Sequence, residues 1–381
     1  MKKISLLSLL YKPHVGGVEN SLQSLAQSYR ALGYEVNVYC TNEPREWNLP
    51  SYEIVENTKV QRFSWKKSRL LFFPFNILYN LFSMSLWLHK RVKDSTCISR
   101  HHIMCLALYF ASIKDFVYIV PEVVKKSKAI REKMTFKEQC VMWVNHILQR
   151  MAIKYAKQTF VFSENVQRQL KEAGIQRQTV IVDPGVDADK FRITKEQSRR
   201  ILKLDDNDIY LLGLGRMIPA KGFQFAIEAL KRIENINVKL LLVGDGPYSA
   251  TLKTRAQQLG LEDRILFCGR TDRPELYFKA CDLFLMTSLN EAFGQTILEA
   301  VFAGKPIIAF NKGHFGNTLV ETASGEILGT TDGVYYCDPD SISLGNMIQR
   351  IIGQASFREI VDYSAIKAKY NWDTLALKLL S

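Results

Sequence analysis

At 381 residues, the chain is long enough for two domains rather than one. Hydrophobic residues make up 47% and charged residues 23%, which is the composition of a soluble globular protein and excludes a disordered or fibrous chain. Seven cysteines, an odd number without paired spacing, favour a reducing compartment and argue against a metal site.

The net charge of +13 is distributed unevenly along the chain. Residues 1–190 contain 28 Lys and Arg against 16 Asp and Glu, whereas residues 191–381 contain 23 against 22. This excess predicts an anionic partner for the N-terminal half: membrane lipid, nucleic acid or a phosphorylated acceptor. Because no recognisable nucleic-acid-binding module accompanies the charge, we do not expect nucleic acid to be that partner.

The chain begins with the pattern strand, glycine loop, helix, strand that opens a doubly wound domain. We expect strands over Ile4–Leu10 and Val36–Cys40, with a helix over Asn20–Leu32 between them. The first apolar run is too short for a signal peptide and lacks a cleavage site. Gly16 and Gly17 do not have Gly-x-Gly-x-x-Gly spacing, so a dinucleotide cofactor is disfavoured. The pair allows a ligand to approach the backbone closely, or simply forms a tight turn.

Residues 70–88 form an uncharged segment of 19 residues with basic flanks. Its length would suit a membrane span, but polar residues interrupt it, and a span would separate strands that must pair. We therefore expect a helix with one face in the core and a second role in shallow insertion into a lipid surface. Helical spacing places these apolar residues on one face: Phe75, Leu78, Tyr79, Phe82 and Leu86. Residues 123–157 are also basic, so residues 59–93 and 123–157 are expected to face an anionic membrane surface.

Two further strands of the first half are followed by polar residues. The strand Thr96–Ser99 leads into Arg100, His101 and His102. Adjacent histidines in a strand point in opposite directions and do not suggest a shared metal. The strand Phe116–Val120 leads into Pro121 and Glu122.

A Pro-Gly linker around residue 184 marks a domain boundary, after which the alternation of strand and helix restarts. We expect domains over 1–183 and 184–365, with a terminal helix over 366–381. Arg216 and Lys221 follow the strand Tyr210–Leu214. Cations on the loop from a strand to a helix face the crevice of such a sheet and suit a diphosphate.

The segment from Met286 to Phe310 reads as strand end, polar loop, helix and strand. Glu291 lies in the loop and Glu299 lies eight residues later in the helix. Gly294 lies where backbone amides open towards an anion at a helix start. Two carboxylates with amides between them suit a sugar joined to a nucleotide diphosphate; the alternative is an ordinary βα unit with solvated glutamates.

Together these motifs resemble the family-four retaining glycosyltransferases, which have the GT-B fold. The motifs are Gly16-Gly17-Val18-Glu19, Gly215-Arg216 with Lys221-Gly222, Gly244-Asp245-Gly246-Pro247, Gly269-Arg270, and the pair Glu291 and Glu299. The resemblance implies an α/β fold of two doubly wound, Rossmann-like domains that face a deep cleft. It also implies that the first domain binds the acceptor, the second binds the nucleotide sugar, and the C-terminal helix crosses back to the first.

The resemblance implies a role for each matching residue. Glu291, Arg216 and Lys221 would be the catalytic group, with the two cations on the donor diphosphate and Glu291 on the sugar hydroxyls. Glu299 would bind the ribose and Arg270 would contact the nucleobase. The remaining donor-binding residues would be Gly16, Gly17, Phe293, Gly294, Gln295 and Thr296. The family works without a metal or cofactor.

One departure from the family concerns a histidine that many relatives carry after the strand matching 116–120. Pro121 and Glu122 stand there in this sequence. His14, His101 and Glu122, with His102 beside them, are therefore candidates for the acceptor or sugar side, and no catalytic base is assigned.

The resemblance implies a retaining, metal-independent transfer of a hexose or N-acetylhexosamine from a nucleotide diphosphate sugar, UDP rather than GDP. The expected acceptor is a lipid-linked or cell-surface saccharide in polysaccharide or lipopolysaccharide biosynthesis, at the cytoplasmic face of a membrane. Two alternatives remain open: a nucleotide-sugar epimerase or hydrolase on the same fold, and a non-catalytic nucleotide-sugar-binding subunit at the membrane surface.

Overall fold

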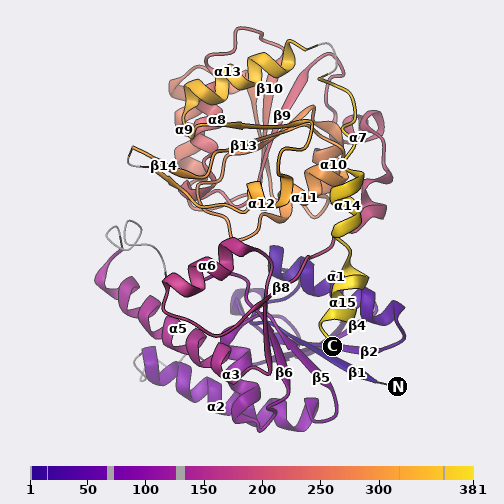
Figure 1. The fold of residues 1–381 in the computed structure, drawn as a ribbon, viewed down its shortest axis with the longest axis vertical. Helices are drawn as coiled ribbons and strands as arrows, with labels where there is room; N and C mark the ends of the chain where they lie inside the picture. The colour runs from indigo at the N-terminus through magenta and orange to yellow at the C-terminus, as the bar shows by residue number, and fades with distance from the viewer. Residues whose placement is uncertain (1, 15, 67–72, 126–133, 317, 355–356) are drawn as a thin grey trace. The chain divides into compact units, whose positions relative to one another are not determined.

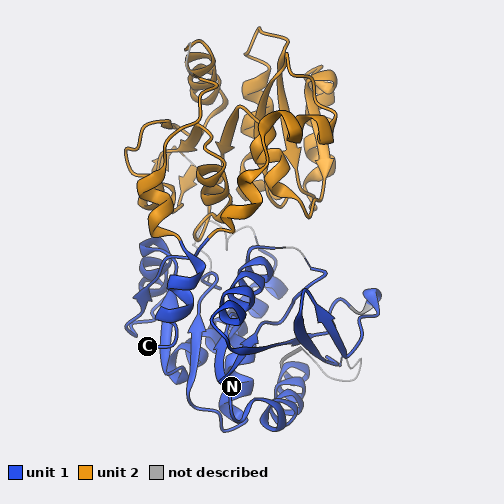
Figure 2. Ribbon diagram, turned by 90° about the vertical axis from the view of Figure 1, so that its right-hand side faces the viewer, with its two compact units in different colours: residues 1–185, 371–381 blue, residues 186–370 orange. Residues whose placement is uncertain are grey.

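The structure is a computed structural model that describes residues 2–14, 16–66, 73–125, 134–316, 318–354 and 357–381. Figure 2 shows its two compact units: Met1–Gly185 with Asn371–Ser381, and Val186–Tyr370. The first unit thus ends two residues after the expected domain boundary, and the last residues of the chain belong to it. Parts of the two segments expected to face a membrane, residues 67–72 and 126–133, lie outside the described residues.

The first unit is built on a sheet whose eight described strands have the order β3-β4-β2-β1-β5-β6-β7-β8. The strands are β1 (Lys3–Leu7), β2 (Glu35–Thr41), β3 (Tyr52–Val55), β4 (Thr58–Phe63), β5 (Thr96–Ser99), β6 (Phe116–Ile119), β7 (Gln158–Val161) and β8 (Val180–Ile181). All neighbouring strands are parallel except β3, which pairs antiparallel with β4. The strand order reverses between β1 and β5, where a doubly wound sheet opens a crevice.

Helices cover both faces of this sheet. They are α1 (Gly17–Ala31), α2 (Phe73–Val92), α3 (His102–Phe110), α5 (Phe136–Tyr155), α6 (Glu164–Glu172) and α15 (Trp372–Lys378). Helices α2, α3 and α5 pack side by side, whereas α15 packs on α1 (Figure 1). The start of α5 is fixed by a capping box in which Thr135 and Glu138 bond each other's backbone N–H groups.

The described part of α2 exposes the apolar face that its sequence spacing defines. Phe75, Leu78, Tyr79, Phe82 and Leu86 are between 45% and 64% exposed. The buried face consists of Ile77, Leu81, Met84 and Leu88. The helix therefore packs through unbranched and branched aliphatic side chains and leaves a row that includes three aromatic rings in contact with solvent. Within the described part of the chain, no helix combines the length and the low polarity that a membrane crossing requires.

The second unit is built on a sheet whose six described strands are all parallel, in the order β11-β10-β9-β12-β13-β16. The strands are β9 (Ile209–Leu214), β10 (Val238–Val243), β11 (Ile265–Gly269), β12 (Leu283–Met286), β13 (Ile307–Phe310) and β16 (Val334–Cys337). Their near-continuous apolar sequences suit strands covered on both faces, and their side chains fill the core of the unit. A hairpin missed by the sequence analysis, β14 (Gly313–Phe315) with β15 (Thr318–Val320), follows β13.

The helices of the second unit lie on the two faces of its sheet (Figure 1). They are α7 (Lys195–Leu202), α8 (Phe223–Leu230), α9 (Ser249–Gln258), α10 (Pro274–Ala280), α11 (Gln295–Phe302), α12 (Ser324–Leu328), α13 (Ser341–Ile352) and α14 (Ser364–Lys369). The predicted doubly wound α/β architecture is thus confirmed for each unit.

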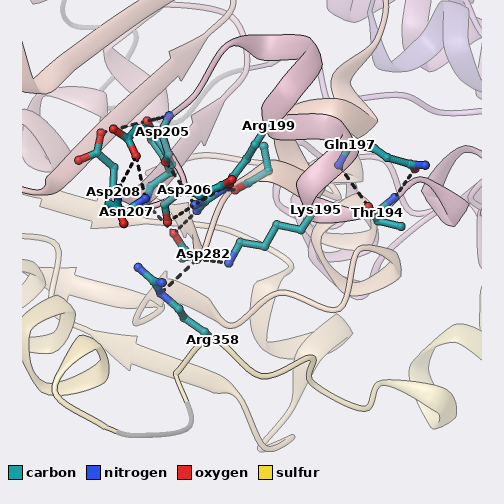
Figure 3. A network of polar contacts seen from close by, with 12 residues as sticks. Thr194, Lys195, Gln197, Arg199, Asp205, Asp206, Asn207, Asp208, Asp282 and Arg358 are labelled. Carbon is teal, nitrogen blue, oxygen red and sulfur yellow. Dashed lines mark hydrogen bonds and ion pairs between the residues drawn. The ribbon is translucent and has the colours of Figure 1, made fainter.

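A buried carboxylate ties α7 to this sheet at the edge where β12 begins (Figure 3). Asp282 is buried and accepts hydrogen bonds at 2.8 Å from the guanidinium of Arg199 and from the backbone N–H of Tyr210. Lys195 forms an ion pair with the same carboxylate, and Arg358 lies 3.8 Å from it. Because the Asp282 carboxylate is shielded from water, these partners offset the free-energy cost of burying its charge.

The C-terminal segment differs from the single helix expected over 366–381. The chain forms α14 in the second unit and α15 in the first, with a break at Tyr370 and Asn371. The Asn371 side chain accepts hydrogen bonds from the N–H groups of Asp373 and Thr374, at 2.8 and 3.1 Å, and so starts a new helix. Helix α15 is held on α1, because the Tyr29 hydroxyl donates to the carbonyl of Ala376 at 2.9 Å.

Candidate active site

The loops that carry the predicted donor-binding residues leave neighbouring strands of the second sheet. Strands β9 and β12 are parallel partners, and the strand order reverses between them. Ligands of doubly wound sheets bind at the carboxyl ends of the strands at such a reversal. Arg216 and Lys221 follow β9, and Glu291 and Gly294 follow β12.

Two hydrogen bonds join these two loops. The Thr287 hydroxyl donates to the carbonyl of Lys221 at 2.8 Å, and the Leu289 N–H donates to the carbonyl of Ala220 at 2.7 Å. Gly222 has a φ of +68°, and a Cβ there would lie 2.0 Å from the carbonyl oxygen of Thr287. Only glycine fits this close approach without moving the backbone.

Arg216 and Lys221, which we call the clamp, differ in their environment. Lys221 is mostly buried and forms an ion pair with Glu291, whose side chain is 19% exposed. The Lys221 stem lies over Gly215, with Cε 3.4 Å from where a Cβ would be. Arg216 is exposed, and its side chain forms no hydrogen bond or ion pair with the described residues. A carboxylate therefore holds Lys221 in position, whereas Arg216 is available to a ligand.

The loop after β10 is pressed against the loop after β9. A Cβ on Gly244 would lie 2.0 Å from the carbonyl oxygen of Gly215, and one on Gly246 would lie 2.4 Å from that of Met217. Arg270, at the end of β11, lies 3.6 Å from the carboxylate of Asp245 and remains largely exposed. Because β11 is parallel to the other strands, Arg270 lies at the same sheet edge as the clamp, where it pairs with Asp245.

Helix α11 begins beside Glu291. Gly294, with a φ of +90°, precedes its first residue, and a Cβ there would lie 2.9 Å from Cδ1 of Ile297. Gln295 and Thr296 form the first turn and are partly exposed. Phe293 is 7% exposed and packs against Tyr370 with ring centroids 6.0 Å apart, so it supports the loop through packing.

Glu299 lies in the second turn of α11 and retains some exposed surface. Burial of the carboxyl group is the largest cause that raises its pKa, to about 8; nearby Lys190 lowers it and Glu275 raises it further. The carboxyl group forms no hydrogen bond with any described residue. A partly buried, unbonded carboxyl group gains most from hydroxyl donors supplied by a ligand.

In the first unit, the predicted glycine loop lies where the strand order reverses. Gly16 precedes α1, and a Cβ there would lie 2.5 Å from a carboxylate oxygen of Glu19. Burial raises the pKa of Glu19, while His14, Arg100 and Lys12 oppose that shift. The Glu19 carboxylate thus folds back over the loop at Gly16. The His14 ring lies 5.2 Å from the ring of Trp47.

The two adjacent histidines are not in a strand, which corrects the expectation that they point in opposite directions. His101 caps α3, where its ring nitrogen accepts from the N–H of Ile103 at 3.2 Å, and His102 is the first residue of the helix. Their rings stack with centroids 4.4 Å apart. His102 bonds the Asn145 side chain at 3.1 Å, and burial lowers the pKa of both imidazoles. Glu122 is exposed, and its carbonyl accepts from Gln149 at 2.8 Å.

Arg100, for which the sequence predicted no role, also lies where the strand order reverses, between β1 and β5. Its N–H donates to the carbonyl of Leu7 at 2.8 Å, and its guanidinium lies 4.6 Å from the ring centre of Phe162. The residue is 4% exposed, and its Nε and Nη1 have no hydrogen-bond partner among the described residues. The available signal was its position directly after β5, the last three residues of which are buried.

The two cations, the carboxylate beside them and the start of α11 form a compact set at one sheet edge. Fixed cations can bind a diphosphate and stabilise the negative charge that develops when it leaves. The carboxylates can accept hydrogen bonds from sugar and ribose hydroxyls. These groups therefore suit a nucleotide diphosphate sugar.

Comparison with known proteins shows which family the second unit matches. Residues 194–351 match the family model described as glycosyl transferases group 1. The stretch covers β9 to β13 and thus every loop of the set described above. The resemblance to glycosyltransferases drawn from the motifs is therefore confirmed.

The similar sequences include enzymes of glycolipid and lipopolysaccharide synthesis. The chain is 24% identical to alpha-monoglucosyldiacylglycerol synthase of Streptococcus pneumoniae, over 94% of this chain and 80% of that protein. It is 29% identical to the GDP-mannose-dependent alpha-(1-6)-phosphatidylinositol monomannoside mannosyltransferase of Mycobacterium tuberculosis, over 58% and 60%. The lipopolysaccharide core biosynthesis glycosyltransferase LpsD of Rhizobium meliloti is 31% identical over 42% and 44%.

Solved structures show the same fold over the whole chain. Sucrose-phosphate synthase from Thermosynechococcus elongatus superposes with a TM-score of 0.82 at 18% identity, covering 100% of this chain and 97% of that one. HepE of Anabaena, in complex with UDP and glucose, gives 0.77 at 20% identity, covering 100% and 98%. The predicted GT-B fold is therefore confirmed.

Proposed function

We propose that this protein is a retaining glycosyltransferase that moves a sugar from a nucleotide diphosphate sugar to a membrane-bound glycolipid or saccharide acceptor. The observation that carries the proposal is the arrangement of Arg216, Lys221 and Glu291 at the reversal of the second sheet. In this proposal the second unit binds the donor and the first unit binds the acceptor.

The chemistry follows from charge. Breaking the bond between the anomeric carbon and the phosphate oxygen leaves positive charge on the sugar and negative charge on the diphosphate. Arg216 and Lys221 stabilise the leaving diphosphate more in the transition state than in the ground state. The acceptor hydroxyl attacks from the face that the phosphate leaves, and its proton passes to a phosphate oxygen. Configuration is retained, and the reaction needs no protein base, metal ion or cofactor.

The remaining donor contacts come from the same sheet edge. When the donor binds, the ion pair between Lys221 and Glu291 breaks. Lys221 then pairs with the diphosphate, and Glu291 accepts hydrogen bonds from the sugar hydroxyls. Glu299 binds the ribose, and Arg270 contacts the base. The start of α11 at Gly294, Gln295 and Thr296 provides backbone amides for the phosphate or sugar.

We propose a UDP-hexose or UDP-N-acetylhexosamine as the donor. HepE, which shares the fold, is known in complex with UDP and glucose. One sequence relative is named as GDP-mannose-dependent, so GDP-sugars are the comparison to make.

The proposed acceptor is lipid-linked, and the protein works at the cytoplasmic face of a membrane. Helix α2 exposes the row Phe75, Leu78, Tyr79, Phe82 and Leu86, and α5 exposes Phe136 and Trp143. Apolar side chains beside an excess of positive charge suit shallow insertion into an anionic lipid surface. One relative, the Streptococcus pneumoniae synthase, is named for a diacylglycerol glycolipid.

Incubation with a panel of labelled UDP- and GDP-sugars, with and without a bacterial lipid extract, tests the proposed activity. We expect nucleotide release that depends on the extract and label that appears in the lipid fraction. Release without an acceptor would indicate a hydrolase, interconversion of the sugar an epimerase, and binding without turnover a non-catalytic subunit. Any of these three results would contradict the proposal.

A further inference from the structure

A pocket of about 320 Å³ opens in the first unit between the end of β4 and α2. Three aromatic side chains form its walls: Phe63, Tyr79 and Trp87. The rings of Phe63 and Trp87 pack edge to face with centroids 5.8 Å apart, and Arg91 lies over the Trp87 ring at 4.7 Å. These contacts fix the walls before any ligand is present.

The rest of the lining is cationic and hydroxylic: Arg62, Lys66, Ser64 and Ser83. Arg62 is 3% exposed and forms an ion pair with Glu53. Its Nη1 and Nη2 donate to the carbonyls of Pro50 and Lys12 at 3.3 and 2.7 Å, and its Nε has no hydrogen-bond partner among the described residues. No carboxylate or amide side chain is among the described residues that line the pocket. A lining of cations and hydroxyl groups suits an anion such as a phosphate.

The segment that carries Lys66 is held in place by a buried amide. The Lys66 N–H donates to the Asn80 side-chain oxygen at 2.7 Å, and the Asn80 side-chain nitrogen donates to the Lys66 carbonyl at 2.7 Å. Asn80 is fully buried in α2. The Trp65 N–H in turn donates to Asn42 at 3.1 Å. Asn80, which interrupts the apolar sequence of α2, thus fixes the backbone at the mouth of the pocket.

Tyr79 belongs both to the pocket wall and to the exposed row of α2. Towards the C-terminal end of the helix, Lys90 and Arg91 are exposed. The pocket therefore adjoins an apolar surface and positive charge, the two features that an anionic lipid matches. We propose that the pocket binds the phosphate headgroup of one anionic phospholipid, whose chains lie along the row. The proposal rests on the proposed membrane association and deepens it.

The test uses the full chain and a lipid too short to form a bilayer. Dihexanoylphosphatidylglycerol is titrated by calorimetry below its micelle concentration, with dihexanoylphosphatidylcholine, inorganic phosphate and glucose as comparison ligands. Ser83→Trp fills the pocket, and Lys66→Ser removes its exposed cation. Lys171→Ser, on α6 and outside both the pocket and the exposed row, is the matched control. Circular dichroism and thermal unfolding establish that each variant is folded.

We expect dihexanoylphosphatidylglycerol to bind wild type and Lys171→Ser with equal affinity. It should bind the two pocket variants at least about tenfold more weakly, as for loss of a charge-assisted bond. Equal binding by Lys66→Ser and wild type would overturn the proposal. So would equal affinity for inorganic phosphate, or a preference for glucose. Sedimentation with phosphatidylcholine vesicles, with and without phosphatidylglycerol, tests membrane association separately through Phe82→Ser in the exposed row. If wild type binds these vesicles while the pocket variants keep full affinity for the short lipid, the headgroup site is wrong and the membrane proposal stands.

Discussion

Lys221 and Glu291, 70 residues apart in the chain, form an ion pair at the carboxyl edge of the second sheet. The pair exists because β9 and β12 are neighbours, so the loops that follow them meet. A donor diphosphate would replace the carboxylate as the partner of Lys221, and the sugar hydroxyls would replace the lysine as the partner of Glu291. The ion pair thus holds both side chains in position before the donor binds.

Replacing the clamp should reduce turnover. We expect Lys221→Ala and Arg216→Ala each to lower kcat by about 10²-fold or more, as for loss of other groups that stabilise a developing negative charge. Steady-state rates of nucleotide release measure this. Lys231→Ala is the control, since Lys231 is exposed and follows the opposite end of α8. Unchanged turnover in Arg216→Ala would remove the clamp assignment.

The close approach of the two loops predicts an effect of Gly222→Ala on stability. Its Cβ would meet the Thr287 carbonyl, and its φ is positive, so we expect a loss of roughly 1–3 kcal/mol in the free energy of unfolding. Gly260→Ala is the matched control, because Gly260 has a φ of +65° and nothing within 4 Å of its Cβ position. Urea denaturation compares them, and equal losses would show that the contact with Thr287 contributes nothing.

The buried Asp282 should be needed for folding and not for chemistry. Asp282→Asn leaves Arg199 buried without its carboxylate, so we expect a loss of about 3 kcal/mol or more in the free energy of unfolding. Arg358→Ala, whose side chain is partly exposed and 3.8 Å away, should cost about 1 kcal/mol or less. Donor affinity of the folded fraction should be unchanged. Asp282 lies before β12 begins, whereas the two clamp loops lie beyond the ends of β9 and β12, at the opposite edge of the sheet. A small effect of Asp282→Asn on stability would contradict this role.

Glu299 should make stability depend on pH. Burial raises the pKa of this carboxyl group from 4.5 to about 8, so the folded protein keeps a proton that the unfolded chain releases. The folded state is therefore favoured by this group at low pH, and that contribution is lost as the pH rises between these two values. Relative to Glu299→Gln, wild type should lose stability from about pH 5 to about pH 8. A stability difference that stays constant over this range would show that the group is not buried as described.

The sequence predicted the architecture well where apolar runs are bounded by glycine and proline. The strand Thr96–Ser99 has the expected bounds, and the strands expected over Phe116–Val120 and Tyr210–Leu214 each differ by one residue at one end, because buried parallel strands leave clear patterns. The end of the chain was wrong, because leucine spacing continues through Asn371 and does not reveal that its side chain starts a second helix.

The candidate site was predictable as a set of residues, and its contacts were not. Strand order brings residue 221 to residue 291, and no local pattern specifies that order. The same limit applies to α2: the spacing identified its large apolar face, but only packing shows that this face is exposed while Ile77 and Leu81 are buried. Arg100 was not assigned a role, because its position after β5 is a weak signal and its burial is evident only from the packing.

Donor binding by the clamp is the central claim, and calorimetric titration with UDP-glucose and with the other nucleotide sugars tests it most directly. At least one nucleotide sugar should bind wild type and Lys231→Ala saturably and with equal affinity, and it should bind Arg216→Ala at least about tenfold more weakly, as expected for one lost charge-assisted contact. Equal affinity of Arg216→Ala and wild type for that ligand, or no binding of any nucleotide sugar to the folded protein, would contradict the account.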